Sequence, residues 1–104
     1  MIKETQFKDK DGRIFVLSAM GYQHIKREHS IQDPIEFIKD TLLDPFAIVE
    51  DKIKHDRWIY HKDFRRNLFK VVVVSLSDQR VKTAFISDKI KGGKIIWLSK
   101  KMIS

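Results

Sequence analysis

Hydrophobic and polar positions follow different periods in the two halves of the chain. In residues 34–43 the apolar side chains of Ile35, Ile38 and Leu42 recur at the spacing of one face of a helix. After residue 45, short runs rich in Val, Ile, Phe and Trp are separated by polar turns, which is typical of strands. The pattern therefore predicts helices in the first half and mainly strands in the second.

Capping residues mark the ends of the predicted helices. Ser18 can accept a hydrogen bond from a free N–H at the start of a helix over 19–28. Asp33 and Pro34 are a typical N-cap and first position for the second helix. Pro45 ends this helix, because the residue before a proline is pushed out of the helical region.

The strand pattern is strongest after the second helix. Residues 68–76 are apolar on both faces, so we expect the central strand of the sheet there. Near the N-terminus, Lys10–Gly12 has the composition of a turn and precedes another strand. The remaining strands are expected over 13–17, 46–50, 57–61 and 81–87. Residues 95–98 form either a last edge strand or a short apolar tail that packs back on the core.

This order of elements is typical of the α+β class. We expect two N-terminal helices packed on one face of an antiparallel sheet of about four strands. The length of 104 residues corresponds to a single domain covering 1–104.

The composition argues against several classes of protein. The hydrophobic fraction of 42% is too high for a disordered chain, and the absence of cysteine excludes disulfides and thiolate chemistry. No apolar run approaches the roughly 20 residues of a membrane span. The segment Met1–Glu4 lacks the apolar core of a secretory signal, so we expect a cytoplasmic protein without membrane contact.

The charge of the chain points to a class of partner. The 21 Lys and Arg residues exceed the 14 Asp and Glu residues, which gives a net charge of +7. A basic surface attracts polyanions, and nucleic acid is the commonest of these. The alternative is that the lysines serve only solubility.

A cluster of candidate catalytic residues lies at the end of the first predicted helix. His24 and Arg27 are three positions apart, so they share a helix face. His29 lies at or just past the helix end, and it reaches the same place only if the chain turns there. Two imidazoles and a guanidinium could supply a general base, a general acid and an anion clamp.

Several segments together resemble a known family. The stretch Gln23–His29, followed by a proline-started helix, resembles the "GHI…RHPE" opening of phage-associated nucleases in the barnase–EndoU–colicin–RelE-like (BECR) superfamily. Further along, 60–62, the valine strand 71–74 and 81–85 resemble that group's Tyr-x-Lys-like, "VVV" and "TAY/TAF" segments. The match covers most of the chain, from residue 21 to residue 85.

The resemblance implies metal-independent RNA cleavage, which is typical of toxins and of phage or mobile-element proteins. It carries the family's first histidine onto His24, the histidine of its "RH" pair onto His29, and its threonine onto Thr83. Glu28 separates Arg27 from His29, so the arginine is displaced by one position from the family's pattern. A toxic nuclease would also need an antitoxin or immunity protein as a partner.

RNA can be cut without a metal when its 2′-hydroxyl attacks the adjacent phosphate. This reaction needs a base, an acid for the leaving oxygen, and donors for the growing charge on the phosphate. Histidine suits the first two roles because its pKa of about 6.5 lies near working pH. We assign His24 and His29 as the acid/base pair, in either order.

Further side chains are assigned to contacts with the RNA. Thr83 would donate its hydroxyl to the phosphate, and Tyr60 would stack a base. The assigned basic side chains are the phosphate clamps Arg27, Lys62 and Arg65, together with Arg66 in the same turn.

Each assigned residue also has a purely structural interpretation. His24 would be a half-buried helix histidine, and His29 a cation near the helix C-terminus. Arg27 would form a surface ion pair, and Thr83 would be a common strand residue. The basic turn would be solvated, and Tyr60 would pack in the core.

No motif indicates a metal or cofactor. His55 and His61 could join His24 and His29, but the chain has no HExxH and no cysteine. Gly92-Gly93 lacks the spacing of a phosphate-binding loop, and no Gly-x-Ser-x-Gly occurs. We therefore expect neither a metal nor a cofactor.

Three functions remain in competition. The leading hypothesis is a small cytoplasmic, metal-independent endoribonuclease, in the manner of a toxin or phage effector. The second is a non-catalytic basic module that binds RNA or protein on the same fold. The third is a structural component of a phage or mobile element. Convergence of His24, Arg27, His29 and Thr83 in one cleft would favour the enzyme.

Overall fold

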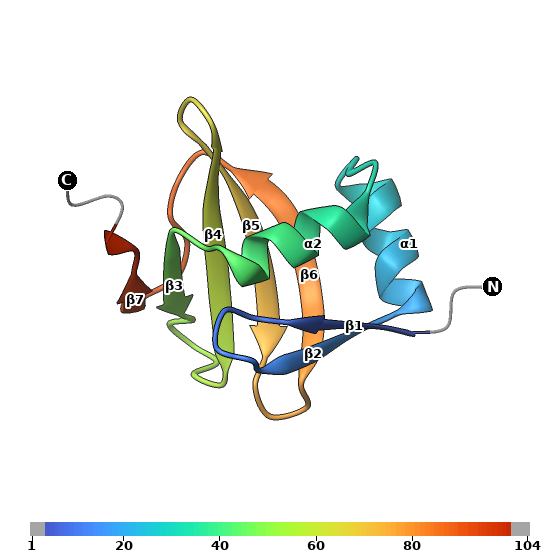
Figure 1. The fold of residues 1–104 in the computed structure, drawn as a ribbon, viewed down its shortest axis with the longest axis horizontal. Coiled ribbons are helices and arrows are strands. Elements are labelled where there is room, and N and C mark those ends of the chain that lie inside the picture. The colour runs from blue at the N-terminus through green and yellow to red at the C-terminus, as the bar shows by residue number, and fades with distance from the viewer. Residues whose placement is uncertain (1–3, 101–104) are drawn as a thin grey trace.

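The fold is one seven-stranded sheet with two helices, seen in a computed structural model that describes residues 4–100 (Figure 1). Residues 1–3 lie outside the described part. They include most of the segment Met1–Glu4, which the sequence analysis considered as a secretory signal. The elements in chain order are β1 (Glu4–Lys8), β2 (Ile14–Ser18), α1 (Ala19–Glu28), α2 (Pro34–Leu43), β3 (Ala47–Glu50), β4 (Arg57–Arg65), β5 (Leu68–Ser75), β6 (Arg80–Ser87) and β7 (Lys94–Leu98).

The prediction of two N-terminal helices packed on one face of an antiparallel sheet of about four strands is wrong, although the class remains α+β. The strand order is β1-β2-β6-β5-β4-β3-β7, and the sheet is mixed because β2 runs parallel to β6. The β1–β2 hairpin joins one side through the pair Val16 and Arg80, while β7 extends the other side by pairing with β3. The local pattern of side chains identifies strands, but it does not show which strands will pair.

Several local predictions are confirmed. β5 is the central strand, with three strands on each side of it. The Ser18 hydroxyl accepts a hydrogen bond from the Gly21 N–H at 3.0 Å, which caps α1. Asp33 accepts from the Glu36 N–H at 3.2 Å, and Pro34 is the first residue of α2. Separately from these predictions, the two helices within residues 4–100 are too short or too polar to cross a membrane.

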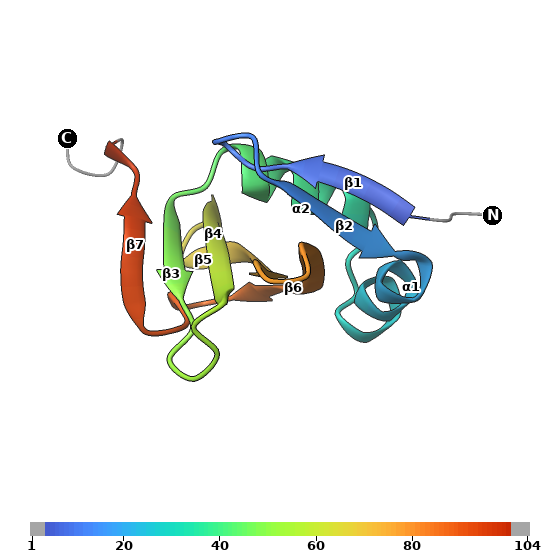
Figure 2. The same ribbon diagram turned by 90° about the horizontal axis from the view of Figure 1, so that it is seen from below.

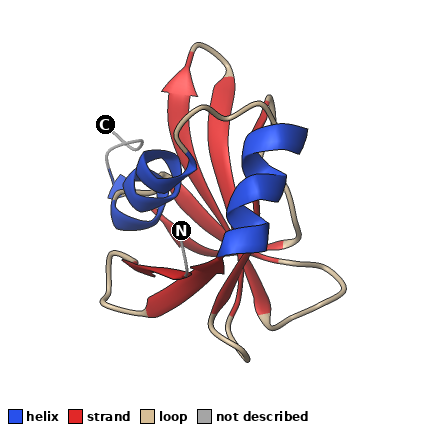
Figure 3. Cartoon of the chain, turned by 90° about the vertical axis from the view of Figure 1, so that its right-hand side faces the viewer, coloured by secondary structure: helices blue, strands red, loops and turns tan. Residues whose placement is uncertain are grey.

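The core lies between α2 and one face of the sheet (Figures 2 and 3). α2 contributes Ile38 and Leu42, which are completely buried. They pack with sheet residues such as Tyr60 and Val72. α1 lies at the side of the sheet, next to β6 and β2, and it is anchored by the buried Ile25.

A buried hydrogen-bond network ties the β1–β2 hairpin to β4. Tyr60 has no exposed surface, and its hydroxyl donates to Asp9 Oδ2 at 2.5 Å. Asp9 also accepts from the backbone N–H groups of Asp11 and Arg13 and from the Arg13 guanidinium. Burial, followed by this bond to Asp9, raises the pKa of Tyr60 far above its usual value. Tyr60 therefore stays protonated and acts as a donor to the buried carboxylate.

The connection between β6 and β7 crosses the face of the sheet opposite α2. We call residues 88–93 the strap. Within it, the Lys91 N–H donates to His61 Nε2 at 2.8 Å, and the Gly93 N–H donates to the Glu50 carbonyl at 2.9 Å. His61 follows Tyr60 in β4, so its side chain points away from the α2 side. The strap thus seals the second face at β3 and β4.

Replacing Gly92 with alanine is expected to destabilise the protein by about 2–4 kcal/mol, from backbone strain and overpacking together. Gly92 has a φ of +98°, and an added Cβ would lie 2.8 Å from Val49 Cγ1 and 2.9 Å from Ile59 Cδ1. Gly12→Ala is the matched control, because Gly12 has a φ of +87° in open space and should lose only about 1–2 kcal/mol. Urea unfolding measures the loss of free energy of unfolding in both variants. Equal losses would show that Gly92 is not closely packed against Val49 and Ile59.

Stability should fall as the pH is lowered from about 6.5 to about 4, because of His61. Burial lowers the pKa of this fully buried histidine to about 4, so the unfolded chain takes up a proton before the native protein does. The loss should amount to roughly 3 kcal/mol and level off below the folded pKa. The free energy of unfolding measured against pH should show this slope in the native protein and a reduced slope in His61→Gln. Identical slopes would remove His61 as the cause.

Candidate active site

The candidate site lies where the end of α1 meets β6. α1 follows β2 directly and packs against both β2 and β6. His24 is exposed on this helix, and His29 is its half-buried C-cap residue. Ser30 has a φ of +55°, so the chain reverses into the left-handed region immediately after His29. This is the turn that the sequence analysis required for both histidines to lie together.

A β-bulge decides which way Thr83 points. Val73 pairs with Thr83, whereas Val74 pairs with Val81, so Lys82 is an extra residue in β6. Val81 faces the buried core, and without the bulge Thr83 would share that face. The extra residue places Thr83 and Phe85 on the opposite face, where both are half-buried. The hydroxyl of Thr83 is therefore accessible beside α1.

Three of the four predicted catalytic residues come together here. The imidazole rings of His24 and His29 pack edge to face, with centroids 5.5 Å apart. His29 Nε2 lies 3.4 Å from Thr83 Oγ1, a long hydrogen bond in which either group can donate. The ring of Phe85 lies against His29, with centroids 5.9 Å apart. The site therefore holds two titratable groups and a hydroxyl beside an aromatic wall.

Arg27 is the predicted catalytic residue that the structure does not bring to this cluster. Its side chain is 75% exposed, and its ion-pair partner within residues 4–100 is the neighbouring Glu28 at 3.8 Å. Such a pair contributes little to stability. The assignment of Arg27 as a phosphate clamp therefore stays a prediction.

Lys62 has a structural role that competes with the predicted phosphate contact. Its Nζ lies 2.8 Å from Asp44 Oδ2 and 3.6 Å from Asp40 Oδ1, which joins β4 to α2. Burial opposes its charge, but the hydrogen bond that Lys62 donates to Asp44 and the charges of Asp40 and Asp44 outweigh burial and raise the pKa of Lys62. Lys62 therefore remains charged, and its charge is already matched by two carboxylates.

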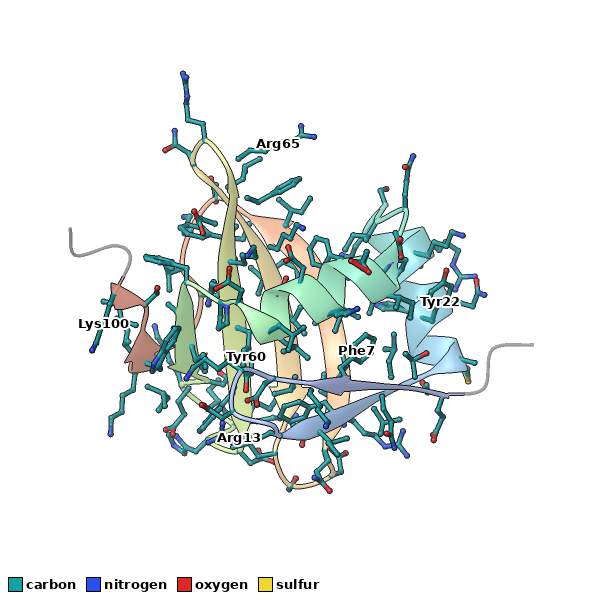
Figure 4. The ribbon with its side chains drawn as sticks, viewed as in Figure 1. Phe7, Arg13, Tyr22, Tyr60, Arg65 and Lys100 are labelled. Carbon is teal, nitrogen blue, oxygen red and sulfur yellow. The ribbon has the colours of Figure 1, made fainter. Side chains whose placement is uncertain are left out.

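Arg65 ends β4 at the β4–β5 hairpin, away from the core (Figure 4). Arg66 follows it in the turn between β4 and β5. Arg66 is exposed, and the Arg65 guanidinium covers the ring of Phe64 at 4.9 Å from its centroid. Their predicted contacts with substrate remain predictions. The assignment of Tyr60 to base stacking is wrong, because its ring is completely buried and its hydroxyl is held by Asp9.

Two aromatic residues near the candidate site were missed from the sequence. Phe85 appeared only as part of a family-like segment, and its contact with His29 depends on the bulge in β6. Phe64 is 39% exposed at the hairpin, and the run of charged residues around it was interpreted as a turn. An apolar ring inside a basic segment was the signal that could have identified Phe64.

Comparison with known proteins adds no relative: no family model, no curated protein and no solved structure matches the chain. Within residues 4–100, no three His, Asp or Glu side chains converge as metal ligands would. The arguments for function below therefore depend on the site's own geometry.

Two matched variants test whether Lys62 stabilises the fold while the solvated Arg27 does not. Lys62→Met should lower the free energy of unfolding by about 1 kcal/mol, because two carboxylates lose their partner. Arg27→Met should change it by less than about 0.5 kcal/mol. Urea unfolding at low and high salt provides the measurement, and salt should reduce the loss at Lys62. If both variants leave the free energy of unfolding nearly unchanged, the ion pairs of Lys62 do not stabilise the fold.

Proposed function

We propose that this protein is a metal-independent endoribonuclease that cuts RNA by attack of the 2′-hydroxyl on the adjacent phosphate. The observation that carries the proposal is the convergence of His24, which is exposed, with His29 and Thr83, which are half-buried. The surplus of positive charge supports a polyanionic substrate. The absence of cysteine and the nature of the substrate favour action in the cytoplasm.

The chemistry follows from the two imidazoles. One neutral imidazole removes the proton from the 2′-hydroxyl, whose oxygen attacks phosphorus to form a 2′,3′-cyclic phosphate. The other imidazole, protonated, gives its proton to the departing 5′ oxygen. The ring of His24 is exposed and packs against His29, while His29 also contacts Phe85 and Thr83.

Thr83 has two compatible tasks at this site. Its hydroxyl can orient His29 through the bond to Nε2, and it can donate to a phosphate oxygen when RNA is bound. The distance of 3.4 Å is long for such a bond in the free protein, and catalytic hydrogen bonds commonly shorten when substrate binds. Arg27 would supply charge by swinging toward the phosphate from its solvated position.

The second candidate is a basic module that binds RNA without cutting it. The observation that favours it over the enzyme is that the assigned phosphate clamps Arg27 and Lys62 do not contact the histidines. Arg27 contacts Glu28, and Lys62 is engaged by Asp40 and Asp44. Removal of either histidine would leave binding by such a module nearly intact, which distinguishes it from the enzyme.

Cleavage of a mixture of tRNA and mRNA by purified protein in excess EDTA tests the proposal. We expect cutting that His24→Ala and His29→Ala each reduce by 10²–10⁴-fold, the usual contribution of a general acid or base. The products should carry 2′,3′-cyclic phosphate ends. Thr83→Val, which keeps the shape and removes the hydroxyl, should reduce the rate by a smaller factor.

His55→Ala is the control variant, because His55 is exposed in the turn before β4 and pairs with Glu50 at 2.9 Å. Its cutting rate should equal that of the native protein. If the native protein binds RNA in a salt-sensitive way but does not cut it, the RNA-binding module becomes the preferred function. If the native protein cuts RNA without EDTA but not in its presence, the metal-independent mechanism is wrong.

A further inference from the structure

The open edge of β1 lies beside a groove on the α2 side of the sheet. Within residues 4–100, β1 is a terminal strand of the sheet and pairs only with β2. α2 runs next to β1 in the same general direction (Figures 1 and 2). Between them is a cleft of about 360 Å³, which is lined by residues 5–8 of β1 and by Ile35, Lys39 and Leu43 of α2. Because these α2 residues follow one another at intervals of four, they form one stripe along the helix.

The register of the β1–β2 hairpin shows which backbone groups β1 leaves open. The Val16 N–H donates at 2.9 Å to the residue that precedes β6, so Val16 directs its backbone groups away from β1. Val16 lies opposite Gln6, and the direction of these groups alternates along an antiparallel pair. Gln6 and Lys8 therefore direct their N–H and C=O groups to the open edge. The Lys10 N–H, further along the same edge, donates to the Leu42 carbonyl at 3.0 Å and closes that end of the groove.

The α2 side of the groove offers an apolar surface to an added strand. Leu43 leaves 46% of its surface exposed, and Ile35 is half-buried. The helix rises about 12 Å between these two residues, which is about the length of four residues in a strand. An extended segment that pairs with Gln6 and Lys8 would therefore lay its alternate side chains on Ile35 and Leu43.

Two lysines give the groove a positive charge. Lys8 and Lys39 are exposed, and within residues 4–100 neither takes part in an ion pair or a side-chain hydrogen bond. None of the described residues that line the groove is acidic. Phe7 is buried in the core on the α2 side, so the neighbouring Lys8 side chain points to the other face of β1. An added strand would therefore meet a lysine on each of its faces.

We infer that this groove binds an extended acidic segment of a partner protein, which adds to β1 as a further strand of the sheet. Backbone hydrogen bonds to Gln6 and Lys8 hold the segment, and its apolar side chains pack on Ile35 and Leu43. In strand addition, main-chain bonds supply affinity and alternate side chains supply specificity. A second copy of this chain fits less well, because its β1 edge carries the same lysines. The phosphates of RNA fit less well, because they only accept hydrogen bonds and leave the carbonyls of β1 without donors.

This inference goes beyond the proposed ribonuclease function and does not depend on it. The groove lies on the α2 side of the sheet, whereas Thr83 lies on the opposite face beside His29. A segment bound along β1 would leave both of these residues uncovered. The groove therefore fits a partner that tethers the protein and does not cover its candidate active site.

Binding of a synthetic peptide of alternating valine and glutamate, blocked at both ends, tests the inference by NMR titration. We expect it to bind roughly tenfold more tightly than the matched valine–lysine peptide. In the free protein, the amide hydrogens of Gln6 and Lys8 should exchange with solvent faster than those of Thr5 and Phe7, which face β2. The valine–glutamate peptide should slow the exchange at Gln6 and Lys8, because both amides gain an acceptor.

Three variants locate the binding on the protein. Lys39→Glu should weaken the valine–glutamate peptide by roughly tenfold, because it places like charges together. Lys94→Glu makes the same change of charge on β7, the terminal strand on the other side, and should weaken it by less than about twofold. Gln6→Pro removes an outward N–H and leaves the β1–β2 ladder intact, so it should also weaken the peptide by roughly tenfold. Urea unfolding verifies that each variant is folded.

Equal affinity for the two peptides, equal losses in Lys39→Glu and Lys94→Glu, or native affinity in Gln6→Pro would overturn the inference. Self-association of the native protein that Gln6→Pro abolishes would assign the edge to a second copy of the chain. Displacement of the peptide by a short single-stranded RNA, lost in Lys39→Glu, would assign the groove to nucleic acid. Either result would also overturn the inference. The rate of RNA cutting should be the same in Gln6→Pro as in the native protein, so the ribonuclease proposal is tested separately.

Discussion

The candidate site depends on the early separation of β2 from β6. These strands pair in parallel at Val16 and Arg80, and the chain then leaves β2 at Ser18 to begin α1. A longer ladder would have filled the side of β6 with another strand. Instead α1 packs there, anchored by Ile25, and presents His24 and His29 beside β6.

The bulge in β6 places Thr83 beside the two histidines. A regular strand would put Thr83 on the face of Val81, inside the core, where a hydroxyl would need a buried partner. The extra residue Lys82 separates the two faces, so that Val81 contributes to stability and Thr83 to the site. Bulges commonly redirect a side chain in this way next to functional sites.

The net charge predicts attraction to a polyanion, but it does not show which cations would contact that partner. The chain carries +7, yet Lys62 and Lys70 are paired with carboxylates of α2 and help to hold that helix on the sheet. The cations nearest the histidines in sequence are solvated. Long-range attraction of RNA follows from the total charge, whereas contact with the scissile phosphate requires particular side chains to move.

By itself the sequence determined the local elements and the candidate chemistry. Ser18, Asp33 and Pro34 specify helix starts through their own backbone contacts, and the valine run of β5 specifies a doubly covered strand. The tertiary structure alone decided the number and order of strands, the burial of Tyr60 and the contact of His29 with Thr83. The physical reason is range: caps and periodicity act within a few residues, whereas strand pairing, the bulge and burial depend on segments that are distant in the chain.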